Sequence, residues 1–286
     1  MIKLMRPISP YPALIIEGDY GKIMVISDLH LGWEASLAED GIHIPSQTGK
    51  MLRKVKEVLA AENPSSLIIL GDLKHTVEKI MLEEWRDVPL FLEEVKKIVG
   101  DIRVIPGNHD GDISILLPNG VKLEPQQGVI VGDVGLFHGH AWPDMKMLNC
   151  KTLVIGHVHP VITFRDHTGY KVTSQVWVKA PCNSITLAKA ILRRYKIKFK
   201  DEEEALRILS EEYSIQPRVE NLIIMPSFNE FLGGRAVNKI SIARDEALRE
   251  FIGPILRSGS INLGEAEVYL LDGTFLGELN QLTIVR

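Results

Sequence analysis

Five segments of this chain share one pattern, an apolar, β-branched run that breaks into histidine, aspartate or asparagine. They are KIMVISDLH (22–30), SLIILGDLKH (66–75), IRVIPGNHD (102–110), VGLFHGH (134–140) and TLVIGHVH (152–159). Short runs of this kind are typical of buried strands. Seven of the nine histidines lie in the tails of these runs, namely His30, His75, His109, His138, His140, His157 and His159. We therefore expect several strand ends to build one polar site.

The segments between the first three runs predict an α/β arrangement. Met51, Val55, Val58 and Leu59 repeat with a helical spacing, and the helix is expected to stop near Pro64. Residues 76–99 predict a second helix, interrupted near Pro89. A β-α-β-α-β order favours parallel strands with right-handed crossovers. In such sheets ligands bind beyond the carboxyl ends of the strands, which is where the polar tails lie.

The pattern changes after residue 119. Hairpins are predicted around the turns Gly132-Asp133, Thr168-Gly169 and Asp272-Gly273. A charged helical excursion is expected at about residues 186–213, and a further helix near 244–257. Without a convincing linker or repeat, we predict one domain over residues 1–286.

Composition excludes several classes of protein. The chain has 33 Lys and Arg residues against 37 Asp and Glu residues, so no global basic field attracts nucleic acid. The composition does not exclude a local basic groove. Two cysteines are too few for a disulfide framework or a thiolate metal cage, which favours a cytoplasmic protein. No apolar run approaches the ~20 residues of a membrane span, so no membrane partner is expected.

The polar tails offer more metal ligands than one ion needs. Carboxylate, amide and imidazole donors without thiolate favour Mn, with Fe, Zn, Co and Ni as alternatives. Two ions that share a carboxylate would use such a set fully, and ions ~3.5–4 Å apart can clamp an in-line displacement at phosphorus. The candidate ligands are Asp28, His30, Asp72, Asn108, His138, His157 and His159.

The order of the tails resembles the calcineurin-like metallophosphoesterases. That family carries D-x-H, GD, GNH(D/E), H and GHxH in this order, and the chain reads DLH, GD, GNHD, FHGH and GHVH over residues 24–159. The segments DLHLGWE, GDLKH and MPSFNEFLGGRAVN are similar to the archaeal and bacterial branch that includes the ligase-associated DNA damage response phosphoesterases.

The resemblance implies a fold and a ligand set. The fold would be a two-sheet β-sandwich flanked by helices, in four layers α/β/β/α, with the active site at the carboxyl ends of the strands. One ion would take Asp28, His30 and His159, the other would take Asn108, His138 and His157, and Asp72 would bridge them. A bridging hydroxide would attack phosphorus, and His109 would protonate the leaving oxygen as the general acid.

One position departs from the family pattern. Many members carry a second acid three residues after the bridging aspartate, and here that position is His75. His75, His140 and Arg235 are candidate substrate contacts, whereas Asp110 is expected in a turn. Lys74 is a further basic candidate, and Trp33 could stack on a base or pack in the core.

The predicted function is therefore a phosphodiesterase or nuclease-like hydrolase that depends on two metal ions. The alternatives are a catalytically silent metal-binding scaffold on the same fold, and a hydrolase of phosphomonoesters or small nucleotides. The expected partner is a phosphoester substrate, with nucleotides and nucleic acids among the options. The oligomeric state is left open, a dimer included.

Overall fold

The computed structural model describes residues 2–165, 167–239 and 253–282. Contacts divide the chain into two compact units. Unit 1 comprises Met1–Gln126 and Ser227–Gly233, and unit 2 comprises Gln127–Pro226 and Gly234–Arg286. Each unit has its own sheet and its own hydrophobic core. The interpretation as a single domain stays a prediction.

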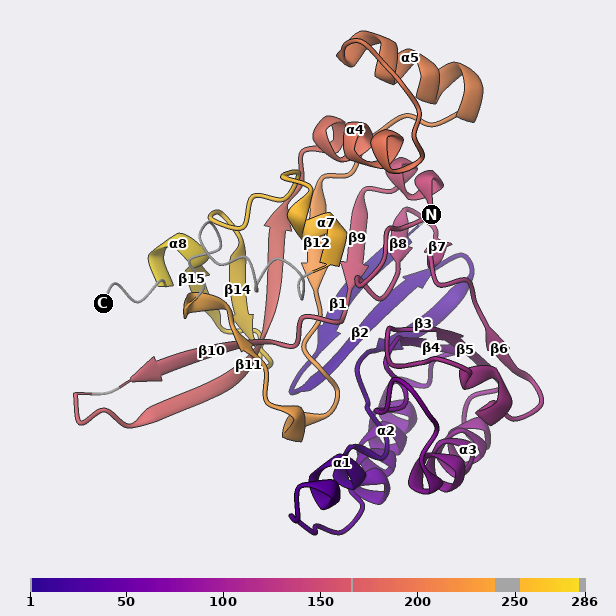
Figure 1. Ribbon diagram of the computed structural model, residues 1–286, viewed down its shortest axis with the longest axis vertical. Coiled ribbons are helices and arrows are strands. Elements are labelled where there is room, and N and C mark those ends of the chain that lie inside the picture. Colours follow the sequence, from indigo (N-terminus) through magenta and orange to yellow (C-terminus); the bar gives the residue numbers. More distant parts are fainter. Residues whose placement is uncertain (1, 166, 240–252, 283–286) are drawn as a thin grey trace. The chain divides into compact units, whose positions relative to one another are not determined.

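Unit 1 is built on a six-stranded sheet whose strands follow one another in chain order (Figure 1). The strands are β1 (Ile2–Ile8), β2 (Tyr11–Gly18), β3 (Gly21–Ile26), β4 (Ser66–Leu70), β5 (Asp101–Ile105) and β6 (Val121–Leu123). The first three pair antiparallel, and β3 to β6 pair parallel. The parallel arrangement predicted for the first three polar-tailed runs is confirmed, so their carboxyl ends share one edge of the sheet.

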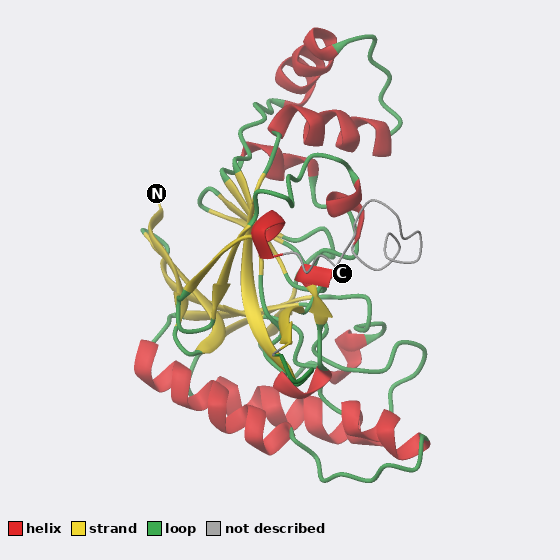
Figure 2. Ribbon diagram, turned by 90° about the vertical axis from the view of Figure 1, so that its left-hand side faces the viewer, coloured by secondary structure: helices red, strands yellow, loops and turns green. Residues whose placement is uncertain are grey.

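Helices α1 (Trp33–Glu39), α2 (Thr48–Glu62) and α3 (Leu82–Lys96) accompany this sheet, with a short 3-10 helix, η1 (Ile113–Leu116), before β6. Figure 2 shows long helices flanking the strands. The four apolar residues that predicted α2 are buried, and α2 ends at Glu62, two residues before Pro64. The predicted interruption of α3 at Pro89 is wrong, because the helix continues to Lys96.

Burial explains why α3 survives its proline. An interior proline typically costs about 3 kcal/mol of helix stability. Val88, Phe91, Leu92 and Val95 are fully buried in the core of unit 1, on both sides of Pro89. Packing of four such side chains offsets a cost of that size.

Unit 2 contains a nine-stranded sheet with the order β13-β10-β11-β12-β9-β8-β7, and β14 and β15 branch from β11. Its strands are β7 (Val129–Val131), β8 (Val134–Leu136), β9 (Thr152–Ile155), β10 (Pro160–Arg165), β11 (Lys171–Pro181), β12 (Asn221–Ile224), β13 (Arg235–Ala236), β14 (Glu267–Leu270) and β15 (Phe275–Glu278). The three predicted hairpins are present as β7–β8, β10–β11 and β14–β15. Strands β8, β9 and β12 pair parallel.

Helices α4 (Ser184–Arg194) and α5 (Glu202–Tyr213) lie at one end of unit 2 (Figure 1). The remaining short elements are η2 (Met145–Asn149), η3 (Glu230–Leu232, in unit 1), η4 (Val237–Lys239), α7 (Gly253–Arg257) and α8 (Leu279–Leu282). Most of the helix expected near 244–257 lies outside the described residues. The fold is mixed α/β with two multistrand sheets flanked by helices, as predicted. Among the described helices, none has the length and apolarity that crossing a bilayer requires, and Cys150 and Cys182 are both free thiols.

Candidate active site

Five predicted ligands adopt a backbone conformation that L-amino acids rarely use. Asp28, His30 and Asp72 in unit 1 have φ of 57°, 46° and 50°. His157 and His159 in unit 2 have φ of 67° and 47°. A left-handed non-glycine residue typically costs about 1–3 kcal/mol and persists only where the surrounding structure fixes it, often at active sites. In each unit, predicted ligands therefore lie on strained turns that follow buried strands.

In unit 1, the turns after β3 and β4 bring three donors together. The amide of Asp28 donates to the Gly71 carbonyl at 3.0 Å, and that of His30 to the Asp72 carbonyl at 2.8 Å. The ligand atoms of Asp28, His30 and Asp72 lie within 4.8 Å of one another. Nε2 of His30 is 3.4 Å from Oδ2 of Asp72, and all three side chains are buried.

The turn after β5 fits closely around Asp72. A Cβ at Gly107 would lie 2.1 Å from Oδ1 of Asp72, so only glycine allows this approach. The amide of His109 donates to the same oxygen at 2.9 Å. Asn108 lies between these two residues and is exposed.

The Asp110 carboxylate links the second and third turns. It accepts from the amides of Gly107 at 2.9 Å and Lys74 at 3.1 Å. Burial, together with the nearby Asp72 carboxylate, raises the pKa of Asp110 to about 6. Asp110 thus holds the polypeptide around Asp72.

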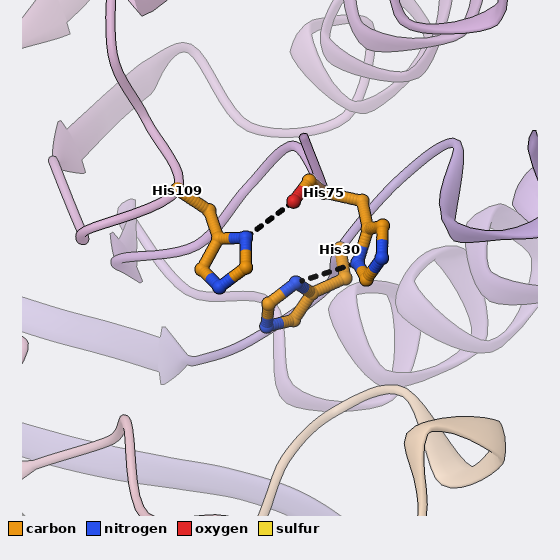
Figure 3. A group of neighbouring side chains, drawn as sticks. All are labelled: His30, His75 and His109. Atoms are coloured by element: carbon orange, nitrogen blue, oxygen red, sulfur yellow. Dashed lines mark hydrogen bonds between the residues drawn. The ribbon is translucent and has the colours of Figure 1, made fainter. Parts of the chain in front are cut away.

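His30, His75 and His109 form a cluster within unit 1 (Figure 3). Nδ1 of His75 is 3.1 Å from Nδ1 of His30, and the backbone carbonyl of His75 accepts from Nδ1 of His109. The ring centroids of His30 and His109 are 4.7 Å apart. Burial, followed by the two neighbouring rings, lowers the pKa of His75 to about 4. His75 therefore contacts both a predicted ligand and the predicted acid.

A buried carboxylate that the sequence did not single out holds the His75 turn. Glu84, at the start of α3, accepts from the amides of His75 at 2.9 Å and Thr76 at 2.6 Å. Its own helix supplies a third donor, the Met81 amide at 2.9 Å. Lys74 is fully buried and its ammonium donates to the Thr76 carbonyl, so Lys74 supports this turn.

The segment Ser227–Gly233 supports the first turn from the far end of the chain. The amide of Phe228 donates to the Ser27 carbonyl at 2.8 Å, and Nδ2 of the buried Asn229 donates to the Leu29 carbonyl at 3.0 Å. The Ser227 hydroxyl lies 3.1 Å from the Asp28 carbonyl oxygen. The motif MPSFNEF contains these residues, and only a family resemblance pointed to it.

The same segment also provides the packing partner of Trp33. Its ring stacks on Phe231 with centroids 5.9 Å apart and an interplanar angle of 14°, and the Lys50 ammonium lies 4.4 Å from the Phe231 centroid. Trp33 is almost fully buried. It therefore packs in unit 1, which was the simpler of its two interpretations.

In unit 2, four histidines gather near the ends of β8 and β9. His138 is fully buried, and its ring centroid lies 5.1 Å from that of His157 and 5.2 Å from that of His140. The Gly156 amide donates to the His138 carbonyl at 3.0 Å, which fixes the two turns to each other. His138 and His157 offer ligand nitrogens within 4.8 Å of each other.

Arg235 lies beside His159 in the sheet of unit 2. Its amide donates to the His159 carbonyl at 3.0 Å, and β13 pairs parallel with β10 from this point. A Cβ at Gly234 would lie 2.4 Å from that carbonyl oxygen, so the glycine allows the two segments to meet. Arg235 is thus close in the fold to a predicted ligand.

The donors present fit a divalent metal ion. Buried carboxylates are costly unless they are paired or coordinate a metal. Asp28 and Asp72 are buried and lie together with the His30 imidazole. Carboxylate and imidazole groups are ligands that Mn, Fe and Zn accept. Hydrogen bonds from backbone amides hold Asp72 in place, as outer contacts typically do for metal ligands.

Residues 21–206 match the sequence model of the calcineurin-like phosphoesterase family. The chain belongs to this family, whose members use divalent metal ions. It is a metallophosphoesterase, a hydrolase that acts on phosphoester bonds.

Two solved structures are similar to this chain. A nuclease MPE from Pseudomonas putida is 18% identical, with 94% of this chain and 98% of that chain covered and a TM-score of 0.49. Yfce, a phosphoesterase from E. coli, is 24% identical, with 50% and 73% covered and a TM-score of 0.32. The search of curated proteins gave no match.

Proposed function

We propose that this chain hydrolyses phosphodiesters with two divalent metal ions, of which Mn is favoured. The carrying observation is the trio Asp28, His30 and Asp72, three buried donors on strained turns at the ends of two parallel strands. The order of the family motifs supports the rest of the ligand set, with Asp72 shared by both ions. The ligands proposed to complete it are Asn108, His138, His157 and His159.

Bound divalent ions would supply an activated water and would offset charge on the phosphoryl oxygens. The protein's own part is to orient these groups and to exclude solvent from the donors. Asp72 suits the shared position because Oδ1 is fixed by the His109 amide while Oδ2 faces His30. A carboxylate oriented from one side in this way keeps lone pairs of both oxygens for metal ions.

His109 is the proposed general acid. A carbonyl oxygen only accepts hydrogen bonds, so the contact with the His75 carbonyl places a proton on Nδ1 of His109. Its Nε2 is then the atom that can deliver a proton to the leaving oxygen. The side chain is partly exposed, as a group that meets a substrate must be. Histidine is the side chain that most often transfers protons in catalysis.

Two further residues are proposed to contact the substrate. Arg235 is adjacent to His159 through a backbone hydrogen bond, and a guanidinium at this place suits a phosphate oxygen. His140 lies against the rings of His138 and His157, so it would steady those ligands or reach the substrate. The His75 side chain faces His30, so its proposed role is support of that ligand.

The test is a comparison of wild type with His109→Ala, loaded with Mn²⁺, on bis-p-nitrophenyl phosphate, p-nitrophenyl phosphate and a dinucleotide. Wild type should prefer the diesters. The variant should lose about 10²–10⁴-fold in kcat on the dinucleotide, and less on nitrophenyl esters, whose leaving group departs with little protonation. Its metal content should equal that of wild type. A wild type inactive with every divalent metal would favour the silent scaffold, and a preference for monoesters would favour the phosphomonoesterase alternative.

A further inference from the structure

The segment Arg193–Lys200, with the sequence RRYKIKFK, joins α4 to α5 in unit 2 (Figure 1, Figure 2). We call residues 193–200 the basic loop. It carries five cationic side chains, all of them exposed: Arg193, Arg194, Lys196, Lys198 and Lys200. This density is unusual in a chain whose formal net charge is −4.

The loop is held in one conformation by its apolar residues. Ile197 and Phe199 are partly buried and pack against the core of unit 2, and the Arg193 guanidinium lies 5.5 Å from the centroid of the Phe199 ring. Lys196, Lys198 and Lys200 alternate with them and face solvent. The backbone turns at Lys196, where φ is 59°, and the residues after it form neither helix nor strand. The loop thus presents a row of charges on an anchored backbone.

Three of the four acidic residues that follow contact groups other than the side chains of the loop cations. The Asp201 carboxylate caps α5 by accepting from the Glu204 amide at 2.9 Å. Glu202 pairs with Lys189 at 3.0 Å, and Glu204 accepts from the backbone amide of Lys200 at 2.7 Å. Among the residues that the structure describes, none of the five loop cations forms an ion pair.

The stability of helix α4 accounts for only two of the five positive charges of the basic loop. Arg193 and Arg194 lie in the last turn of α4, where cations complement the helix dipole. Lys196, Lys198 and Lys200 lie beyond the helix, and like charges this close repel one another. The stability of α4 therefore does not account for these three exposed lysines.

The form of the loop indicates the anion. A surface hollow of about 590 Å³ is lined by Arg193, Lys196, Ile197, Lys198, Phe199 and Lys200. Tyr195 stands among the cations and is 49% exposed. A cationic groove next to an exposed aromatic ring is the combination that proteins use for single-stranded nucleic acids, with phosphates on the cations and a base on the ring.

The basic loop is remote from the unit 2 histidines. β11 ends at Pro181 beside Asn221, and Asn221 pairs with Thr152, the first residue of β9. α4 begins three residues after Pro181, whereas His157 and His159 follow the other end of β9. Even the four residues of β9 span roughly 13 Å. Only an extended polyanion, and no small phosphoester, can therefore reach both places.

We propose that the basic loop is a docking site for the phosphate backbone of single-stranded nucleic acid. Docking there would make a polynucleotide the substrate of the hydrolase. That consequence rests on the proposed function, whereas the binding itself does not.

The test is fluorescence anisotropy of a labelled 30-nucleotide single strand, with metal-free protein, over a series of salt concentrations. The loop variant carries Lys196→Gln, Lys198→Gln and Lys200→Gln. The control carries Lys3→Gln, Lys97→Gln and Lys122→Gln, which removes the same charge from exposed lysines that are ion-paired. Each phosphate contact adds about 0.7 to the salt slope of single-strand binding. The loop variant should therefore lose about 2 from the slope and bind roughly a hundredfold more weakly at 0.1 M salt.

Turnover separates this proposal from the proposed function. With Mn²⁺, the loop variant should hydrolyse bis-p-nitrophenyl phosphate as wild type does, but should show a raised KM on the 30-nucleotide strand. Tyr195→Ala should weaken binding of the single strand more than that of a duplex. Equal strand binding by the loop and control variants would overturn the proposal. So would loop-dependent binding to phosphatidylglycerol vesicles without loop-dependent binding to the strand. If Lys198→Glu alone leaves strand affinity unchanged, the loop is not the docking site. An inactive wild type that still binds strands through the loop would refute only the hydrolase.

Discussion

Replacing His75 with alanine tests how this site holds its metal ion. Nδ1 of His75 lies 3.1 Å from Nδ1 of His30, while Nε2 of His30 faces Asp72. If His30 binds a metal ion through Nε2, its Nδ1 carries a proton and donates it to His75. His75 then acts on the metal ion through His30. We expect His75→Ala to weaken metal binding while leaving the backbone carbonyl that orients His109.

The size of the effect follows from the type of hydrogen bond. A neutral hydrogen bond contributes about 0.5–1.5 kcal/mol net, and one with a charged partner about 1.5–3 kcal/mol. A metal-bound imidazole lies between these cases, because the ion polarises its N–H. Removing the partner of a ligating histidine typically costs 10–100-fold in metal affinity, and that range corresponds to about 1.4–2.7 kcal/mol. The two estimates agree.

The assay is competition for Mn²⁺ between the protein and a fluorescent chelator. His75→Ala should bind the tighter ion 10–100-fold more weakly, and His75→Gln, whose amide oxygen can accept the same proton, should recover part of the loss. His43→Ala removes an exposed histidine and is the matched control. Wild-type affinity in His75→Ala would refute the reasoning. Loss of an additional third ion, with the first two unaffected, would instead make His30, His75 and His109 a metal site of their own.

Three further predictions concern the same turns. Asp72→Asn should lower activity more than His138→Ala does, because Asp72 is proposed to touch both ions; steady-state kinetics of both variants at saturating Mn²⁺ decides this, and the reverse order would reject the bridging assignment. Asn229→Ala should reduce the free energy of unfolding by about 1–3 kcal/mol, since it leaves the buried Leu29 carbonyl without its donor; urea titration measures this, and an unchanged midpoint would contradict it. The pKa of His75 is lowered to about 4 from 6.5, so its contribution to stability is full above pH 6.5 and is lost as pH falls toward 4. Metal-free wild type should accordingly lose more stability between pH 7 and pH 5 than His75→Ala, and equal losses would show that His75 does not remain neutral.

The sheet of unit 1 was predictable because its signals are local. Apolar runs with polar tails identified β3, β4 and β5, and helical spacing identified α2, so parallel pairing followed from the order of elements. The convergence of Asp28, His30 and Asp72 follows from the same order, because parallel strands end at one edge. Pro89 was misjudged because a local rule met tertiary packing, which contributes more than the proline costs.

Contacts between distant parts of the chain left no such local signal. Asn229 supports Leu29 from 200 residues away, and Glu84 looks like any acidic residue in the first turn of a helix. The cationic residues of the basic loop can be read from the sequence, but the contacts of the neighbouring acidic side chains cannot. Only the structure shows that Asp201 and Glu204 serve helix α5 and that Glu202 pairs with Lys189.

The left-handed turns explain why the site needs so much support. At Asp28, His30, Asp72, His157 and His159 the backbone favours glycine, yet the chemistry needs a carboxylate or an imidazole. Five such residues at about 1–3 kcal/mol each represent a cost comparable to the whole stability of a typical domain. Packing of the neighbouring buried strands and the hydrogen bonds that backbone amides make between the turns must offset this cost. Glycine at any of these positions would relax the backbone and remove the ligand together, so stability and metal affinity should change in opposite directions.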